Sequence, residues 1–520
     1  MWPPLATDQT DRCGLPLTTH AARAAALYRD AIDRVFGAEA GAEALLDRAV
    51  ACDPAFTLAH VARWMLAHAN GDKRAAHAAR DAAMSGRDGL TAWELGHLES
   101  MAALIERQPD AWTKARAHLL AHPGDLLLAS QLVGDLFFHG GERKREVVMD
   151  LLRSLAPHHR DDWAFQARLG FHTSELGDPG GRIALLECAL AARPQATFVA
   201  HAMAHALLES GERAASYRFL RDWVSRHDPA GPIDGHIHWH LSLGELEHGQ
   251  PTVAIERYLR STAPGASHCA FGLQLADAGG LFCRMALDGT PPYGIPRAEL
   301  RDLIGTMSGA LRIPFVAVHV SALALVLGEP DVLDRCVDAM DRVAHETGRD
   351  AEYRVVTAFR FYAAGDLRAC VEALEGDREH CWEAIGGSNE ERALIAKLHA
   401  RASAQLAATH VPARESDVVT GLARILRAPL VACVALACML STASCAEPRS
   451  TEMPRPAAQQ PRVHHVLGIG TCTDDVSVTS TAPAFSLSPL TAPLPPPQPS
   501  AERCDALPDS DGAHLDGTSE

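Results

Sequence analysis

The stretch from His201 to His240, HAMAHALLESGERAASYRFLRDWVSRHDPAGPIDGHIHWH, contains two histidine pairs with the same spacing. His201 and His205 are four residues apart, and so are His236 and His240. Residues four apart lie on the same face of a helix, so each pair is predicted to present both imidazoles on one side. The pairs are themselves 35 residues apart, since 236 − 201 = 35. A repeat of paired helices with this period would put both pairs at equivalent places in successive repeats.

Prolines recur with nearly the same period. Intervals of 34, 37, 35 and 35 residues separate Pro123, Pro157, Pro194, Pro229 and Pro264. Proline cannot continue a helix, so each one is expected to end a unit. Glycines that suit the turn between two helices lie between these prolines, at Gly140-Gly141, Gly211 and Gly249. A 34-residue unit closed by proline is typical of the tetratricopeptide repeat, which predicts an all-α solenoid of helical hairpins wound as a right-handed superhelix.

Composition agrees with a helical fold and excludes one class of partner. Apolar residues make up 47% of the 520 residues, but aromatic residues only 5%, and strands prefer aromatic and β-branched side chains. The net charge of −17 is spread along the chain, whereas nucleic-acid binding requires clustered cations. The thirteen cysteines include no C-x-x-C pair, which argues against a zinc knuckle or a disulfide framework.

Changes in composition divide the chain into five segments. Residues 1–20 are rich in turn formers and predicted to be extended, and residues 21–408 form the predicted solenoid. Residues 409–427 read as a polar linker, and residues 428–446 are apolar and uncharged. Residues 447–520 contain twelve prolines and one aromatic residue, and such a tail is predicted to be disordered.

The apolar segment 428–446 has three possible origins. It resembles a lipoprotein signal, with Arg424 and Arg427 before it and Cys445 near its end, but such signals stand at an N-terminus. Of the three origins, the first is a membrane anchor, although the segment is slightly shorter than the ~20 residues of a typical span. The second is a helix that packs on the end of the solenoid. We favour a third origin, a fused or misread neighbouring gene product, because nothing in the tail resembles the preceding domain. The N-terminus shows no export signal, so we expect a cytoplasmic protein with no membrane partner unless this anchor is real.

Several stretches together resemble the tetratricopeptide repeat protein 38 family. The resemblance is based on three motifs: Gly14–Thr19 before a helix, the segment HAMAHALLESGE with His201 and His205, and the arrangement H-x-x-W-H at His236, Trp239 and His240. Asp277 and Arg284 fit a further segment of the family, ADAGGLFCRM. The resemblance covers about residues 12–408. It implies a helical-repeat fold and, because the family has no established activity, no catalytic residue.

The run from Gly386 to Arg392 (Gly386, Gly387, Ser388, Asn389, Glu390, Glu391, Arg392) resembles the GGS-x-A-Q-R-D signature of the same family. It departs from that signature at Glu390, Glu391 and Ala393, where the family has Ala, Gln and Asp. Backbone N–H groups at this helix start could bind an anion, with Arg392 one turn further on. The favoured interpretation is a serine or asparagine N-cap, since Glu390 and Glu391 suit the helix dipole and would repel an anion.

The histidines have two interpretations. Imidazoles at i and i+4 can bind one transition metal, and two such pairs in register offer four nitrogens to Zn, Fe or Cu. The motif lacks the glutamate of H-E-x-x-H, so the site would be structural or redox-active, not proteolytic. The favoured alternative is that the histidines are buried packing residues. Residues that could support the imidazoles in either case are Glu209, Asp234, Trp239, Asp277 and Arg284.

The architecture favours a scaffold that binds a protein or peptide in its groove. This interpretation is based on the fold and not on a recognised site. The competing hypothesis is a metal-binding protein or metalloenzyme that uses His201, His205, His236 and His240. The sequence does not specify the partner, a substrate or the oligomeric state.

Overall fold

A computed structural model describes residues 9–139, 143–177, 182–227, 230–290, 294–375 and 382–409. Apart from an isolated bridge between Thr10 and Pro16, the regular structure in these residues is helical. The expected linker 409–427 (beyond Thr409), apolar segment 428–446 and tail 447–520 lie outside the described residues. Among the residues that are described, no helix combines the length and apolar character needed to cross a membrane.

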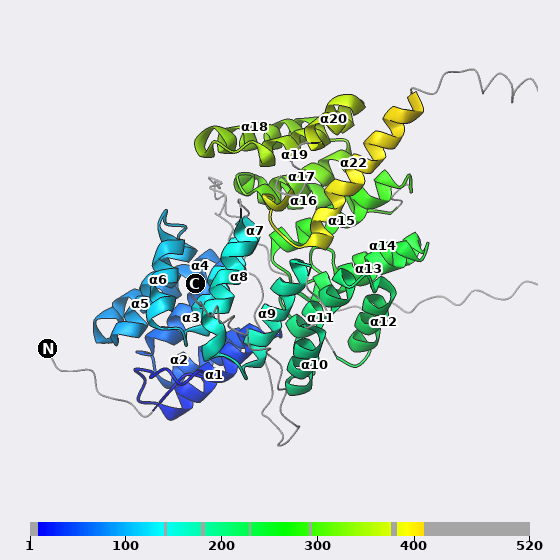
Figure 1. Ribbon diagram of the computed structural model, residues 1–520. Helices are drawn as coiled ribbons and strands as arrows, with labels where there is room; N and C mark the ends of the chain where they lie inside the picture. The colour runs from blue at the N-terminus through cyan, green and yellow to red at the C-terminus, as the bar shows by residue number, and fades with distance from the viewer. Residues whose placement is uncertain are drawn as a thin grey trace, which may run out of the picture. The chain divides into compact units, whose positions relative to one another are not determined.

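Antiparallel helical hairpins follow one another along the chain (Figure 1). In the first half the pairs are α1 (Ala22–Phe36) with α2 (Ala42–Cys52), α3 (Thr57–Ala69) with α4 (Lys73–Ser85), α5 (Ala92–Ile105) with α6 (Ala111–Ala121), α7 (Leu126–His139) with α8 (Lys144–Leu155), and α9 (Trp163–Glu175) with α10 (Arg182–Ala192). Short 3₁₀ turns, η1 (Arg87–Gly89) and η2 (Ala156–His158), follow α4 and α8.

The hairpins continue beyond Pro264, where the sequence rhythm weakens. Two pairs precede Pro264: α11 (Thr197–Glu209) with α12 (Arg213–Val224), and α13 (Asp234–Glu247) with α14 (Pro251–Ser261). The pairs after it are α15 (Phe271–Leu287) with α16 (Arg297–Met307), α17 (Pro314–Leu327) with α18 (Pro330–Thr347), and α19 (Ala351–Ala364) with α20 (Leu367–Leu374). The turn η3 (Ser308–Ala310) follows α16, and α22 (Asn389–Thr409) is the last described helix. The predicted tetratricopeptide-like fold is therefore confirmed.

The predicted punctuation lies between helices. Pro123 and Pro194 separate one hairpin from the next, and Pro157 lies in η2. Gly211 and Gly249 turn the chain between the two helices of a hairpin, with φ of 80° and 70°. L-residues with a side chain rarely adopt this left-handed conformation, which explains the glycines. Pro229 and Gly140-Gly141 lie outside the described residues.

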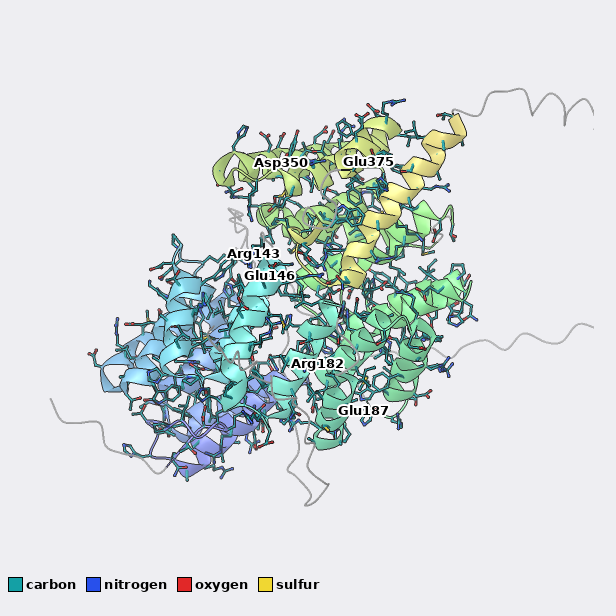
Figure 2. The ribbon with its side chains drawn as sticks, viewed as in Figure 1. Arg143, Glu146, Arg182, Glu187, Asp350 and Glu375 are labelled. Atoms are coloured by element: carbon teal, nitrogen blue, oxygen red, sulfur yellow. The ribbon has the colours of Figure 1, made fainter. Side chains whose placement is uncertain are left out.

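Within the repeats, the first helices of neighbouring hairpins pack against one another. Contacts join α9 to α11, α11 to α13 and α13 to α15, which lie side by side in this order (Figure 1). The second helices are amphipathic. Figure 2 shows Glu146 on α8 and Glu187 on α10, both exposed, while Leu186 on α10 is buried. First helices therefore carry most of the buried side chains, including the polar ones.

The segment before α1 is held by side chains of the first hairpins. Arg12 forms ion pairs with Asp33 on α1, at 2.7 Å, and with Asp162 at the start of α9, at 3.0 Å. The backbone N–H of Thr18 donates to Glu94 on α5 over 2.8 Å. This stretch thus lies along the first helices as part of the folded protein.

Candidate metal centre

The structure brings the four histidines of the two H-x-x-x-H motifs together. His201 and His205 come from α11, and His236 and His240 come from the adjacent helix α13. Their side chains are buried, with exposed fractions between 0% and 7%. One ring nitrogen of each lies within 4.8 Å of one ring nitrogen of every other. The repeat spacing of 35 residues has therefore produced a single cluster of four imidazoles.

His205 lies at the centre of this cluster. Its Nε2 lies 3.0 Å from His201 Nε2 and 3.2 Å from His240 Nε2. Its Nδ1 lies 2.9 Å from Oε1 of Glu175, the last residue of α9. Because a carboxylate accepts, Nδ1 of His205 donates to Glu175, and its other ring nitrogen, Nε2, faces its two neighbours.

His236 is oriented by a second buried carboxylate. Its Nδ1 donates to Asp277 Oδ1 on α15 over 2.6 Å, and Asp277 is fully buried. The indole of Trp239 stacks on the His236 ring, with 5.0 Å between centroids and 15° between planes. The carboxylate and the indole fix the ring and leave the Nε2 of the neutral imidazole free to bind a metal ion.

The pKa values of the imidazoles in the cluster are shifted in opposite directions. Burial, assisted by His205 and His236, holds the pKa of His201 and of His240 well below the ordinary value. Burial also opposes the charge on His236, but the Asp277 carboxylate outweighs it and raises the pKa of His236. Burial raises the pKa of Asp277 to about 6. Two imidazoles are therefore neutral at pH 7, whereas the His236–Asp277 pair holds a proton more tightly.

The other residues expected beside the imidazoles have different positions. Asp234 accepts hydrogen bonds from the backbone N–H and Nδ1 of His268, at 3.0 and 2.7 Å, so it orders the loop before α15. Burial and the nearby Glu175 raise the pKa of Glu209 to about 7. The guanidinium of Arg284 lies over Trp239, 5.7 Å from the ring centroid. Of the expected supporting residues, only Asp277 hydrogen-bonds directly to an imidazole of the cluster.

The run from Gly386 to Arg392 forms a tight turn that starts α22. Ser388 Oγ accepts from the N–H of Glu391 over 3.2 Å, and Glu391 Oε2 accepts from the N–H of Ser388 over 2.7 Å. This reciprocal pair is a capping box. Arg392 donates to the carbonyl of Gly387 and, over 2.6 Å, to Asn389 Oδ1. Arg392 therefore folds back on its own turn, as the N-cap interpretation expects.

Glu175 was not predicted from the sequence. It precedes His205 by 30 residues, so it does not follow the 35-residue register of the histidines. Its position on the last residue of a helix gives no sequence signal either. Phe171, one helical turn before Glu175, also lies beside the cluster, with its ring centroid 5.0 Å from that of His205, but this contact is visible only in the structure.

A second group, Cys13, His159 and Asp162, also has ligand atoms within 4.8 Å of one another. Asp162 already pairs with Arg12 and accepts the N–H groups of Ala164 and Phe165 over 2.9 and 3.0 Å. Burial raises the pKa of the Cys13 thiol, which keeps it protonated. A metal ligand must be deprotonated and available, so this group is a weaker candidate than the four imidazoles.

Comparison with known proteins supplies no closer assignment. No protein-family model matches the chain. The solved structures with similar folds include yeast Tom70 (10% identity, TM-score 0.26, 72% of this chain and 88% of that chain covered) and the P58(IPK) TPR domain (11%, 0.16, 71% and 94%). A third is Naa15/Naa10 bound to HypK-THB (15%, 0.21, 69% and 58%). With TM-scores this low, the similarities support no functional argument, and the fold assignment depends on the hairpins themselves.

Proposed function

We propose that this helical-repeat protein binds one divalent transition-metal ion, of the Zn²⁺ class, through His201, His205, His236 and His240. The observation that carries the proposal is the pair of short contacts at His205 Nε2. This one ring nitrogen faces two other Nε2 atoms, at 3.0 and 3.2 Å. A single ring nitrogen can form only one good hydrogen bond, either as donor or as acceptor. Four nitrogens bound tetrahedrally to zinc at about 2.0–2.1 Å would lie about 3.3 Å apart, close to both distances.

The charges around the cluster also suit a divalent cation. Glu175 and Asp277 are both buried, with 3% and 0% exposure, and each accepts a hydrogen bond from one imidazole. Four neutral imidazoles and an ion of charge +2 would be balanced by these two carboxylates. A buried charge is costly unless it is compensated. Carboxylates that accept the second N–H of a ligating histidine are the usual outer partners of a protein zinc site.

The geometry favours a structural role for the ion. A site with four protein ligands has no open position for water or substrate, in contrast to catalytic zinc sites with three. The ligands come from α11 and α13, and their carboxylate partners come from α9 and α15. The ion would therefore link four neighbouring first helices. Zinc fits a tetrahedral set of four nitrogens better than copper(II), which prefers tetragonal geometry.

The test is the metal content of the full-length chain, measured by mass spectrometry after purification without added metal. We expect about one zinc ion per chain in the wild type and almost none in His201→Ala/His240→Ala. His238→Ala is the matched control, because His238 lies on α13 but contacts Arg257 instead of the cluster. The wild type should also bind cobalt(II) with the intense visible absorption of four-coordinate sites. Metal-free wild-type protein that also takes up no added zinc or cobalt would refute the proposal.

The second candidate function is the binding of a protein or peptide. A specific observation favours it: a wide pocket lies between α2, α3 and the loops before α13 and α15, with Met65, Leu66, Gly231 and Phe271 in its lining. Phe271 is 41% exposed, so its ring offers apolar surface at this pocket. A partner that co-purifies with the wild type and is lost in Phe271→Glu, at unchanged melting temperature, would support this function. Equal recovery with both chains would refute it for this pocket.

We also propose membership of the tetratricopeptide repeat protein 38 family, supported by the order of its motifs at His201–Glu212, His236–His240 and Gly386–Arg392. A cytoplasmic location is part of the same proposal. It is supported by free buried thiols at Cys269, Cys283, Cys336 and Cys370, since free cysteines are typical of a reducing compartment. Cys188, in contrast, is disulfide-bonded.

A further inference from the structure

The turn at residues 386–392 packs across several repeats that lie far from it in sequence. The N–H of Gly387 donates over 3.0 Å to the carbonyl of Phe137, near the end of α7. Glu390 pairs with Arg213 at 3.0 Å, and its backbone carbonyl accepts from Arg284 on α15. The turn therefore lies against the first helices as a bound peptide would, although it belongs to the same chain.

Two glycines allow this close approach. Gly386 and Gly387 have φ of 93° and 76°, in the region that disfavours residues with a side chain. A Cβ at Gly386 would lie 2.7 Å from the carbonyl oxygen of Phe138. A Cβ at Gly387 would lie 2.5 Å from the ring of Phe315. A methyl group at either position would therefore push the turn away from α7 and α17.

The turn reaches the histidine cluster through Glu175. Oε1 of Glu175 accepts from His205 Nδ1 over 2.9 Å, and Oε2 accepts from the backbone N–H of Asn389 over 2.6 Å. The Asn389 side chain donates to the backbone carbonyl of Glu175 over 3.0 Å and accepts from Arg145. One carboxylate thus joins the turn to the central imidazole. If the turn left this position, Oε2 of Glu175 would lose its hydrogen bond and the carboxylate would no longer be held in one orientation.

We propose that residues 386–392 act as an internal ligand that closes the metal site and controls the exchange of the ion, with Asn389 as a positioning residue for Glu175. This inference depends on the proposed function. The four imidazoles are at most 7% exposed, so an ion can leave only when the packing around them opens locally. Docking of the turn adds several hydrogen bonds and ion pairs to that packing, and its loss would make the opening more frequent.

The experiment compares zinc release from the full-length wild type and Gly387→Ala, with a chromogenic chelator in excess. We expect Gly387→Ala to release zinc about tenfold faster or more. Gly348→Ala is the matched control, because Gly348 also has a positive φ, of 71°, but a Cβ there meets nothing within 4 Å. It carries the same backbone strain without touching the turn. Equal release rates for the two variants would overturn the inference.

A second variant tests the positioning role directly. Asn389→Ala removes the bonds from the side-chain amide to the Glu175 carbonyl, Arg145 and Arg392 but adds no clash. It keeps the backbone N–H that donates to the Glu175 carboxylate. We expect faster zinc release and a shifted visible spectrum of the cobalt(II) form, because Glu175 would be held less firmly against His205. Asn389→Asp, which retains an acceptor for Arg145, should restore part of the wild-type zinc release rate and spectrum. An unchanged spectrum and release rate in Asn389→Ala would refute the positioning role. A wild type that binds neither ion would instead refute the proposed function, so the two failures are distinguishable.

Discussion

His236 Nδ1 lies 2.6 Å from Asp277 Oδ1, and this hydrogen bond joins two first helices within the buried core. We expect Asp277→Asn to weaken zinc affinity about 10- to 100-fold, because the amide no longer fixes the tautomer of His236. Competition with a calibrated chelator measures this change. Asp234→Asn is the control, since Asp234 orders the loop at His268 and should affect stability more than affinity. Equal losses of affinity in both variants would contradict the assignment.

Zinc binding should displace more protons at low pH than at high pH. Asp277 raises the pKa of His236 above the ordinary 6.5, and the pKa of Asp277 itself is raised to about 6. At low pH the pair therefore holds a proton that zinc must expel, whereas above the raised pKa of His236 less of it remains. Titration calorimetry in two buffers of different ionisation enthalpy counts the released protons. Proton release that is independent of pH, or that increases with pH, would contradict this assignment.

Lys144 should make the metal-free protein more stable as the pH rises. Burial lowers its pKa from 10.5 to about 7, so between these values the unfolded chain binds a proton that the folded chain does not. The free energy of unfolding therefore increases across this window, by at most about 1.4 kcal/mol per pH unit from this group. Urea unfolding of Lys144→Met should lose that increase. Lys114→Met, at an exposed lysine paired with Asp110, should retain it.

Close contact between α12 and α13 should make Gly244 intolerant of a side chain. A Cβ at Gly244 would lie 2.3 Å from the ring of Tyr217. We expect Gly244→Ala to lower the free energy of unfolding by about 1–3 kcal/mol through overpacking. Gly305→Ala, on α16 with open space around the Cβ, should instead raise it by about 0.5–1 kcal/mol. Chemical denaturation measures both changes, and a stabilised Gly244→Ala would mean that these hairpins pack less closely.

Contacts between residues separated by the repeat period could be predicted from the sequence. Contacts at other separations could not be predicted from the repeat. The 35-residue offset between His201 and His236 was visible because one hairpin stacks on the next with a constant displacement. Glu175 lies 30 residues before His205, which does not match the repeat, and it was missed. Asp277 lies 41 residues after His236, and it was expected from the family segment that contains it and not from the repeat. Asp234 was expected beside the cluster from its proximity in sequence, but it is the first residue of α13 and its carboxylate reaches the neighbouring loop instead.

The turn at residues 386–392 shows the same limit. Its capping box could be predicted because Ser388 and Glu391 are neighbours on one helix start. Its contact with Glu175 spans 214 residues, and no periodicity in the chain indicates it. Such a contact results from the way the hairpins stack, so it becomes visible only when all of them are placed.

Arrays of stacked hairpins usually contact only their nearest neighbours, and their unfolding can begin at any place and spread. The bonds of Gly387 with α7, of Asn389 with α9 and of Glu390 with α15 connect the turn before α22 to hairpins that do not neighbour it in the row. These hairpins should therefore melt as one cooperative block. Shortening the chain from its C-terminal side past the turn would then loosen units some two hundred residues upstream, which a simple linear stack would not do.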